Sequence, residues 1–252
     1  MTTNGRGNRD RWRAFLSVLE EAKSREGDFI TLPGGFFRVH SLGTKKTAAN
    51  RIFSEAQKHG IAVAVGVDVV RKRQPEKGRG GKLTAKDGKL HEMTVRRQKI
   101  SSFVVCWSRA SRRKCWRQRS TTCKDQIWVP TRICLRSQEV SVNNLVVEVL
   151  SCGEIFNKRI RGAIINRKAR VDTVVDLAHA GRGLRISPAL RLFGRYGMSS
   201  FCSAHVNRTN AMKRAFNNRG VDISSRDSDI NIPCSSRVNA PPPRIEMKIC
   251  EL

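Results

Sequence analysis

Apolar residues recur at every third or fourth position in two segments near the start of the chain, residues 12–22 and residues 45–59. This spacing places them on one face of a helix. Each segment is followed by a glycine, Gly27 or Gly60, the residue that most often ends a helix. The pattern therefore predicts two amphipathic helices. Their predicted buried faces consist of Trp12, Phe15, Leu16, Leu19, Ala22 and of Ala48, Ala49, Ile52, Phe53, Ala56.

Three short apolar segments around the second helix are typical of strands. Phe29–Leu32 and Phe36–His40 flank the sequence Pro33-Gly34-Gly35, which favours a hairpin. From Ile61 to Val69 apolar residues alternate with small or polar ones, as in a half-buried strand. The resulting order, α-β-β-α-β, predicts a small α+β domain over residues 1–73.

The pattern weakens beyond residue 73. Residues 74–124 combine glycines with many lysines and arginines and show no apolar period, which predicts a basic linker or loop. Residues 125–221 are expected to form a poorly defined mixed α/β region, and residues 222–252, with their serines and prolines, a disordered tail. The elements predicted in the mixed region are a strand at Leu145–Leu150 and helices at Val171–Ala180, from Ser187 onward, and at Thr209–Arg219.

The net charge of the chain says more about its function than the rest of its composition does. The chain has 49 Lys plus Arg and 21 Asp plus Glu, a formal net charge of +28. Such an excess repels itself in a compact state and favours a polyanionic partner, most often nucleic acid. No apolar run approaches the roughly 20 residues of a membrane span, and no apolar leader follows Met1, so we expect an intracellular protein with no membrane partner.

All eight cysteines lie at or after Cys106, and none is in a Cys-x-x-Cys pair. We therefore expect reduced thiols, no metal and no cofactor. A zinc site assembled from distant ligands remains an alternative, with Cys202 and His205 as its one close pair.

Residues 43–50, Gly-Thr-Lys-Lys-Thr-Ala-Ala-Asn, form the sharpest local motif. They resemble the start of the second helix of double-stranded RNA-binding domains, where a Ser/Thr-Lys-Lys-x-Ala pattern opens the helix. The resemblance implies that Lys45 and Lys46 contact phosphates across a groove of the RNA duplex. An ordinary capped helix with solvated lysines is the alternative.

Two further segments suggest contacts with nucleic acid. Residues 171–195 resemble a helix-turn-helix, which implies that Arg191 and Arg195 face a DNA groove; an ordinary helical pair is the alternative. Trp107 and Trp116 lie among arginines and could stack on bases, or could simply be buried.

Catalytic patterns are sparse, since the carboxylates are scattered and the five histidines form no close pair. We therefore predict no catalytic residue and a non-enzymatic nucleic-acid-binding protein, with RNA slightly favoured. A DNA-binding regulator, a basic structural protein of a ribonucleoprotein assembly and a nuclease are the alternatives. The predicted nucleic-acid-binding residues are Lys45, Lys46, Arg71, Lys72, Arg73, Arg79, Lys82, Arg96, Arg97, Arg112, Arg113, Lys114, Trp116, Arg191 and Arg195.

Overall fold

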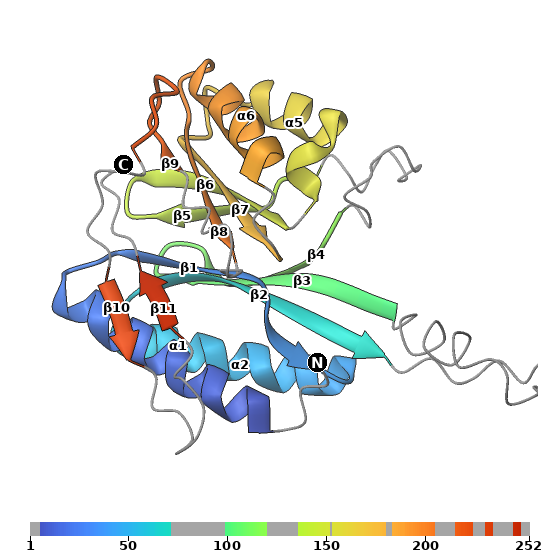
Figure 1. Ribbon diagram of the computed structural model, residues 1–252, viewed down its shortest axis with the longest axis vertical. Helices are drawn as coiled ribbons and strands as arrows, with labels where there is room; N and C mark the ends of the chain where they lie inside the picture. The colour runs from blue at the N-terminus through green and yellow to red at the C-terminus, as the bar shows by residue number, and fades with distance from the viewer. Residues whose placement is uncertain are drawn as a thin grey trace, which may run out of the picture.

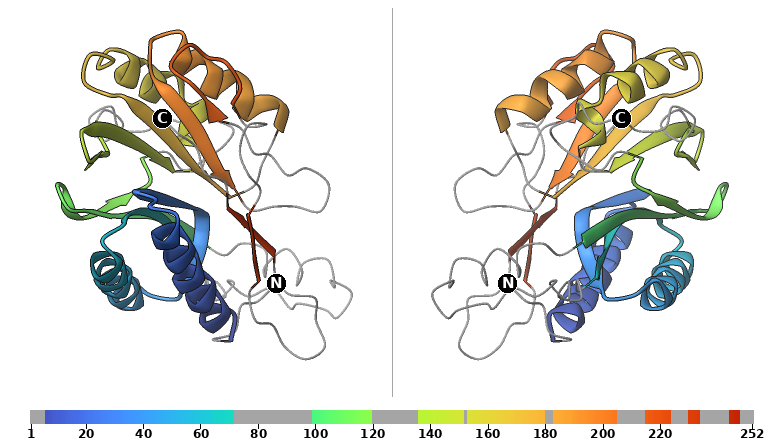
Figure 2. Two further views of the ribbon diagram at one scale, coloured as in Figure 1. Left: turned by 90° about the vertical axis from the view of Figure 1, so that its left-hand side faces the viewer. Right: turned by 90° about the vertical axis from the view of Figure 1, so that its right-hand side faces the viewer.

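Two β-sheets stack face to face in this protein, with a pair of helices on the outer side of each sheet (Figures 1 and 2). The layers thus follow the order helix, sheet, sheet, helix. The computed structural model describes residues 6–71, 99–119, 136–151, 153–179, 183–204, 215–223, 230–233 and 244–247.

The first sheet has the strand order β1-β2-β3-β4. Strand β1 pairs parallel with β2, and the β2–β3 and β3–β4 pairs are antiparallel. Helix α2 makes the crossover between the parallel strands, and α1 lies beside it on the same face (Figure 1). The elements are α1 (Arg6–Ser24), β1 (Phe29–Val39), α2 (Leu42–His59), β2 (Ala62–Arg71), β3 (Lys99–Ser108) and β4 (Arg112–Arg117).

The second sheet has the strand order β5-β6-β7-β8-β9. Strands β6, β7 and β8 are parallel, and β5 and β9 pair antiparallel at its two edges. The elements are β5 (Glu139–Val142), β6 (Leu145–Ser151), the 3-10 helix η1 (Glu154–Phe156), α5 (Lys158–Ile165), β7 (Thr173–Ala178), α6 (Gly183–Gly194), β8 (Ser199–Ala204) and β9 (Ala215–Phe216). A separate antiparallel pair is formed by β10 (Ile230–Pro233) and β11 (Arg244–Met247).

Apolar side chains fill all three spaces between the layers. Phe15 and Ile52 belong to the cluster between the first sheet and its helices. Leu190 and Phe193 belong to the cluster between the second sheet and α6. Val104 and Val149 belong to the cluster between the sheets. Both sheets are therefore covered on both faces, which is the usual environment of parallel strands.

The two predicted amphipathic helices are confirmed as α1 and α2. Helix α2 begins at Leu42, three residues before the predicted start, because Ser41 caps it: its hydroxyl accepts a hydrogen bond from the Thr44 backbone N–H. Thr44 in turn bonds the Ser41 N–H, which completes a capping box. Gly60 ends the helix in the left-handed conformation, as predicted.

The predicted hairpin at Pro33-Gly34-Gly35 is wrong. Residues 29–39 form one strand that pairs with β2 in parallel, and its register shifts between Leu32 and Phe37. The Pro-Gly-Gly sequence makes an irregularity within a strand instead of a turn between two strands. The strand predicted at Ile61–Val69 is confirmed as β2, although residues 62–70 are buried on both faces.

The helix predicted at Val171–Ala180 is also wrong, because Thr173–Ala178 is strand β7, buried at all six positions. Helix α6 begins at Gly183, ahead of the predicted start at Ser187. A strand followed by one helix cannot form the helix-turn-helix that residues 171–195 resemble. The strand predicted at Leu145–Leu150 is confirmed as β6.

The predicted fold class, a small α+β domain with a basic linker and a disordered tail, is therefore wrong. Strands β3 and β4 arise from the predicted linker and complete the first sheet, and β10 and β11 arise from the predicted tail. In the helix predicted at Thr209–Arg219, residues 209–214 lie outside the described residues, and Ala215–Phe216 is strand β9. The domain boundaries at residues 73, 124 and 221 stay predictions.

Candidate functional site

The carboxyl ends of β7 and β8 reach the middle of β1 in the opposite sheet. The Ser203 hydroxyl, near the end of β8, donates a hydrogen bond to the Thr31 carbonyl of β1 (3.1 Å). At the end of β7, the Leu177 carbonyl and the His179 ring lie directly against Gly34. The carboxyl edge of parallel strands is where α/β proteins most often place their sites.

A histidine–carboxylate pair joins the two sheets at this place. His179 Nε2 lies 3.0 Å and 2.9 Å from the two carboxylate oxygens of Asp68 in β2. Ser102 of β3 donates its hydroxyl to Asp68 Oδ1 (2.8 Å). Asp68 is completely buried, whereas the His179 side chain is 29% exposed. The carboxylate is therefore held from both sides, and the imidazole keeps contact with solvent.

Glycines make room for this pair. A Cβ on Gly34 would lie 2.8 Å from His179 Nδ1 and 2.7 Å from the Leu177 carbonyl oxygen. Gly35 has φ +64°, and a Cβ there would lie 2.6 Å from Asp68 Oδ2. All three distances are too short for a residue with a Cβ. The two glycines therefore allow β1 to pass this close to His179 and Asp68.

Arg11 of α1 holds the same stretch of β1 from the other side. Its guanidinium donates to the Gly35 carbonyl (2.7 Å) and to the Phe36 carbonyl. Burial lowers the pKa of Arg11, the positive charge of Arg38 lowers it further, and the charge of Asp68 opposes both effects. Arg11 therefore lies close enough to both Arg38 and Asp68 to be affected by their charges.

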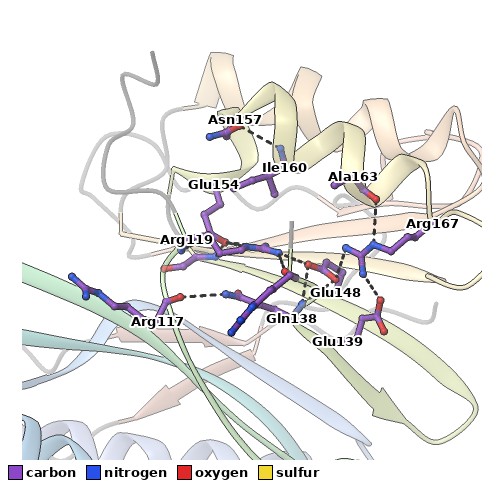
Figure 3. A network of polar contacts seen from close by, with 12 residues as sticks. Arg117, Arg119, Gln138, Glu139, Glu148, Glu154, Asn157, Ile160, Ala163 and Arg167 are labelled. Atoms are coloured by element: carbon purple, nitrogen blue, oxygen red, sulfur yellow. Dashed lines mark hydrogen bonds and ion pairs between the residues drawn. The ribbon is translucent and has the colours of Figure 1, made fainter. Parts of the chain in front are cut away.

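A second polar cluster centres on Arg119, which follows β4 and is 4% exposed (Figure 3). The Arg119 guanidinium donates to Glu148 Oε1 of β6 (2.8 Å), to Glu154 Oε2 of η1 (3.0 Å) and to the Arg136 carbonyl (2.8 Å). Its backbone N–H donates to Glu154 Oε1. Because both carboxylates lie nearby, the pKa of Arg119 is raised even though burial alone would lower it.

The cluster continues along the edge of the second sheet. Arg167 donates to Glu148 Oε2 (3.2 Å) and to Glu139, and Arg170 donates to Glu139 Oε2 (2.9 Å). Three arginines thus face three glutamates, which satisfies the condition that buried charges be paired. We call these six residues the Arg119 network: Arg119, Arg167, Arg170, Glu139, Glu148 and Glu154.

The Arg119 network fixes the chain at the carboxyl end of β6. Glu154 Oε2 accepts a hydrogen bond from the Ser151 backbone N–H (3.1 Å), which closes a tight turn after the strand. Gly153 within this turn has φ 88°, a left-handed conformation that favours glycine. Cys152, between Ser151 and Gly153 in the chain, lies outside the described residues. Strands β6 and β7 pair Ser151 with Leu177, so this turn and His179 follow neighbouring strands at the same edge.

The described residues contain no group of three or more His, Cys, Asp or Glu side chains that could hold a metal ion. In the one close pair noted for the zinc alternative, Cys202 and His205, His205 lies outside the described residues. No helix in the described part of the chain is long and apolar enough to span a membrane.

The described residues among the predicted nucleic-acid-binding set lie on α2, β2 and β4, and in or just after α6. Lys45 packs its Nζ 4.2 Å from the Phe103 ring centroid and 3.7 Å from Cys115 Sγ, while Lys46 is exposed. Trp107 is 7% exposed in the first core, and Trp116 packs against the cluster between the sheets, so neither side chain is a free stacking platform.

The remaining predicted residues lie on different elements. Arg112, Arg113 and Lys114 are exposed on β4, and Arg191 and Arg195 are exposed in α6 and just after it. Arg71 ends β2. The others lie outside the described residues: Lys72, Arg73, Arg79, Lys82, Arg96 and Arg97.

Comparison of the sequence with protein-family models and with curated proteins finds no match. Solved structures do match. The chain is similar to a cysteine-to-serine variant of the Nesterenkonia AN1 amidase from the nitrilase superfamily, with TM-score 0.58 and 11% identity over 83% of this chain and 78% of the amidase. It is also similar to an amidase from Nesterenkonia sp., with TM-score 0.58 and 12% identity over 86% and 79% of the two chains.

A third similar structure is that of an amidase variant with a ligand attached covalently at its active site. It is a variant of the amidase from Nesterenkonia sp. AN1 with the acetamide moiety of fluoroacetamide added covalently at its active-site cysteine. Its TM-score is 0.56, with 12% identity over 83% of this chain and 77% of the amidase. At these identities the matches establish the fold, which is that of nitrilase-superfamily amidases.

These matches correct the functional predictions. The resemblance to a double-stranded RNA-binding domain is wrong, because helix α2, which carries Lys45 and Lys46, is part of a fold similar to that of the amidases. The predicted non-enzymatic, nucleic-acid-binding function and its nucleic-acid partner are also contradicted, because the similar structures are amidases with an active-site cysteine. Net charge describes the surface of a chain and not its fold, which is why it misdirected the interpretation.

Sequence reasoning missed His179, Asp68 and the Arg119 network. The histidine and the aspartate are 111 positions apart, so no local spacing connects them. One signal was present: a cysteine, Cys152, directly follows the apolar run Leu145–Leu150 and Ser151. The end of a buried strand is a common place for a functional side chain.

Proposed function

We propose that this protein is a cysteine-dependent hydrolase of small amides, with Cys152 as its nucleophile. The observation that carries the proposal is the turn after β6. There the Glu154 carboxylate holds the Ser151 N–H, and Cys152 occupies the chain between Ser151 and Gly153. This turn ends a buried parallel strand within the fold of amidases that use an active-site cysteine.

A cysteine at such a turn suits nucleophilic catalysis. Thiolate sulfur attacks a carbonyl carbon and forms a thioester, which divides one difficult hydrolysis into two easier steps. The Arg119 network contributes rigidity, because a nucleophile must approach the carbonyl within a narrow range of distance and angle. The reaction needs a reduced thiol, so an intracellular location is part of this proposal.

The experiment is a measurement of ammonia release from small aliphatic amides, beginning with butyramide, a ligand of a similar amidase variant. We expect the wild-type protein to release ammonia and Cys152→Ser to lose at least about 10³-fold in kcat/KM. Cys115→Ser is the matched control, because Cys115 is exposed on β4. Equal activity in the wild type and Cys152→Ser would disprove the proposal.

A further inference from the structure

Strand β4 lies at one edge of the first sheet. It pairs antiparallel with β3, and no strand within the described part of the chain pairs with it on its other side. Such an edge presents backbone N–H and C=O groups to which another extended chain can bond. Five of the six β4 residues are exposed, and Trp116 is partly buried. The edge is therefore open to a partner.

The hydrogen bonds to β3 define which residues of β4 face outward. In an antiparallel pair, opposite residues alternate between pairs that bond each other and pairs whose backbone groups point away. The Gln118 N–H, directly after β4, donates to the Ser102 carbonyl of β3 (2.9 Å). Counted from this bond along the register, the alternate residues direct their N–H and C=O groups outward; they are Arg113, Cys115 and Arg117.

The side chains of the same three residues lie on the face of the sheet that α2 covers. Cys115 Sγ lies 3.7 Å from Lys45 Nζ of α2, and the guanidinium carbon of Arg113 lies 5.7 Å from the Phe53 ring centroid. Arg117 is two positions beyond Cys115 and therefore shares this face. Lys45, Arg113 and Arg117 thus place three cations along the outward-facing positions of the edge.

These charges decide what can pair with the edge. Strand β4 has the sequence Arg-Arg-Lys-Cys-Trp-Arg, with four cations and no carboxylate. A second copy of β4 would place like charges opposite one another, which disfavours pairing between copies. An acidic segment would place opposite charges there, and the net charge of +28 favours its approach.

We propose that β4 is a docking edge for an extended acidic segment of a partner protein, which adds to the first sheet as a further antiparallel strand. Docking at β4 does not depend on whether the chain hydrolyses amides. Antiparallel addition is the more stable of the two orientations, and in it the outward-facing residues bond directly to the residues opposite them.

The geometry of the edge also defines the sequence that fits it. Residues directly opposite one another in a sheet share a face. The partner side chains opposite Arg113, Cys115 and Arg117 therefore lie on the α2 face, beside Arg113, Lys45 and Arg117. The edge fits a segment with Asp or Glu at three alternate positions. Backbone hydrogen bonds supply affinity, and the alternation of acidic side chains supplies specificity.

The test is the fluorescence anisotropy of a labelled peptide titrated with the full-length protein. The peptide has glutamate at three alternate positions, with valine and threonine between them. We expect saturable binding to the wild type. We expect the double variant Arg113→Glu, Arg117→Glu to bind at least about tenfold more weakly, because two attractive pairs become repulsive. Full retention of binding by this variant would overturn the proposal, as would absence of binding to the wild type.

The matched control is the double variant Lys158→Glu, Arg159→Glu. It makes the same change in net charge at two exposed positions of α5, which lies on the outer side of the second sheet (Figure 1). At about 0.15 M salt, exposed charges more than about 8 Å apart are largely screened, so this variant should bind the peptide as the wild type does. An equal loss in both double variants would show attraction to net charge alone and would overturn the proposal.

Methylation of the peptide backbone separates strand addition from attraction between charges. In the proposed register the N–H groups of the glutamates point toward β4, and those of the intervening residues point away. Methylation of the glutamate N–H groups should abolish binding, whereas methylation of the intervening N–H groups should preserve it. Equal binding of the two methylated peptides would overturn the proposal. So would equal binding of a peptide of the same composition whose glutamates are consecutive.

Discussion

Gly34 shows how a single missing side chain decides the geometry of the candidate site. In the sequence, Pro33-Gly34-Gly35 is typical of a turn, and the glycines would serve its backbone. In the structure the glycines lie within a strand, and what matters at Gly34 is the space that a Cβ would occupy. That space contains the His179 ring and the Leu177 carbonyl.

We therefore predict that Gly34→Ala displaces His179. The new methyl group would lie 2.8 Å from His179 Nδ1 and 2.7 Å from the Leu177 carbonyl oxygen, so the ring and the backbone of β1 must both shift. Overpacking a filled site typically costs about 1–3 kcal/mol, and we expect a loss of about that size in the free energy of unfolding. Urea unfolding monitored by circular dichroism measures it.

Gly162→Ala is the matched control. Gly162 lies within α5, and a Cβ there would have no atom within 4 Å. Alanine favours a helix over glycine by about 0.5–1 kcal/mol, so this variant should be slightly more stable and as active as the wild type. If Gly34→Ala is as stable as the wild type, β1 does not pass as close to His179 and Leu177 as the structure describes.

At the scale of elements, the Arg119 network connects the end of β4 with β5, β6, η1 and the segment after α5 (Figure 3). Its hydrogen bonds reach the turn that precedes Glu154. The same contacts that neutralise the buried charges therefore also hold the carboxyl end of β6 at Ser151.

We predict that Arg119→Met destabilises the protein by about 3–5 kcal/mol, because it leaves the carboxylates of Glu148 and Glu154 buried without their main cation. Urea unfolding monitored by circular dichroism measures the change. Arg25→Met removes an exposed ion pair with Glu21 one helical turn away and should cost no more than about 0.5 kcal/mol. Equal losses in the two variants would contradict the structural role of the network.

The elements also show what could be predicted from the sequence. The sequence predicts helices α1 and α2 because each has one apolar face and one polar face. It predicts a helix in place of strand β7 because a strand covered on both faces contains a short apolar run without alternation. The parallel pairing of β1 with β2 and the contact between Asp68 and His179 are made by residues far apart in the chain. Local periodicity carries no information about either.

At the scale of the whole molecule, the two sheets are joined by an apolar layer as well as by the site. Cys106 of β3 is fully buried in that layer. Cys202 of β8 packs at the edge of the second core. Burial raises the pKa of both thiols well above the ordinary range, and for Cys202 the nearby charge of Asp176 raises it further.

A dependence of stability on pH follows from these thiols. In the unfolded chain they ionise near pH 8.5, while in the folded protein they stay protonated to higher pH. The unfolded state therefore loses protons first, and stability falls as pH rises above about 8.5, by up to about 1.4 kcal/mol per pH unit for each thiol. Cys106→Ala should have a shallower slope than the wild type in urea unfolding at pH 8, 9 and 10. Parallel slopes would show that Cys106 ionises freely in the folded protein.

The central claim is that Cys152, at the end of β6, is the nucleophile of an amide-hydrolysing site. The most direct test is to incubate the full-length protein with fluoroacetamide and to locate the adduct by peptide mass spectrometry. We predict one acetamide adduct at Cys152, formed faster than any at the exposed Cys115. An adduct at Cys115 with Cys152 unmodified would contradict the claim.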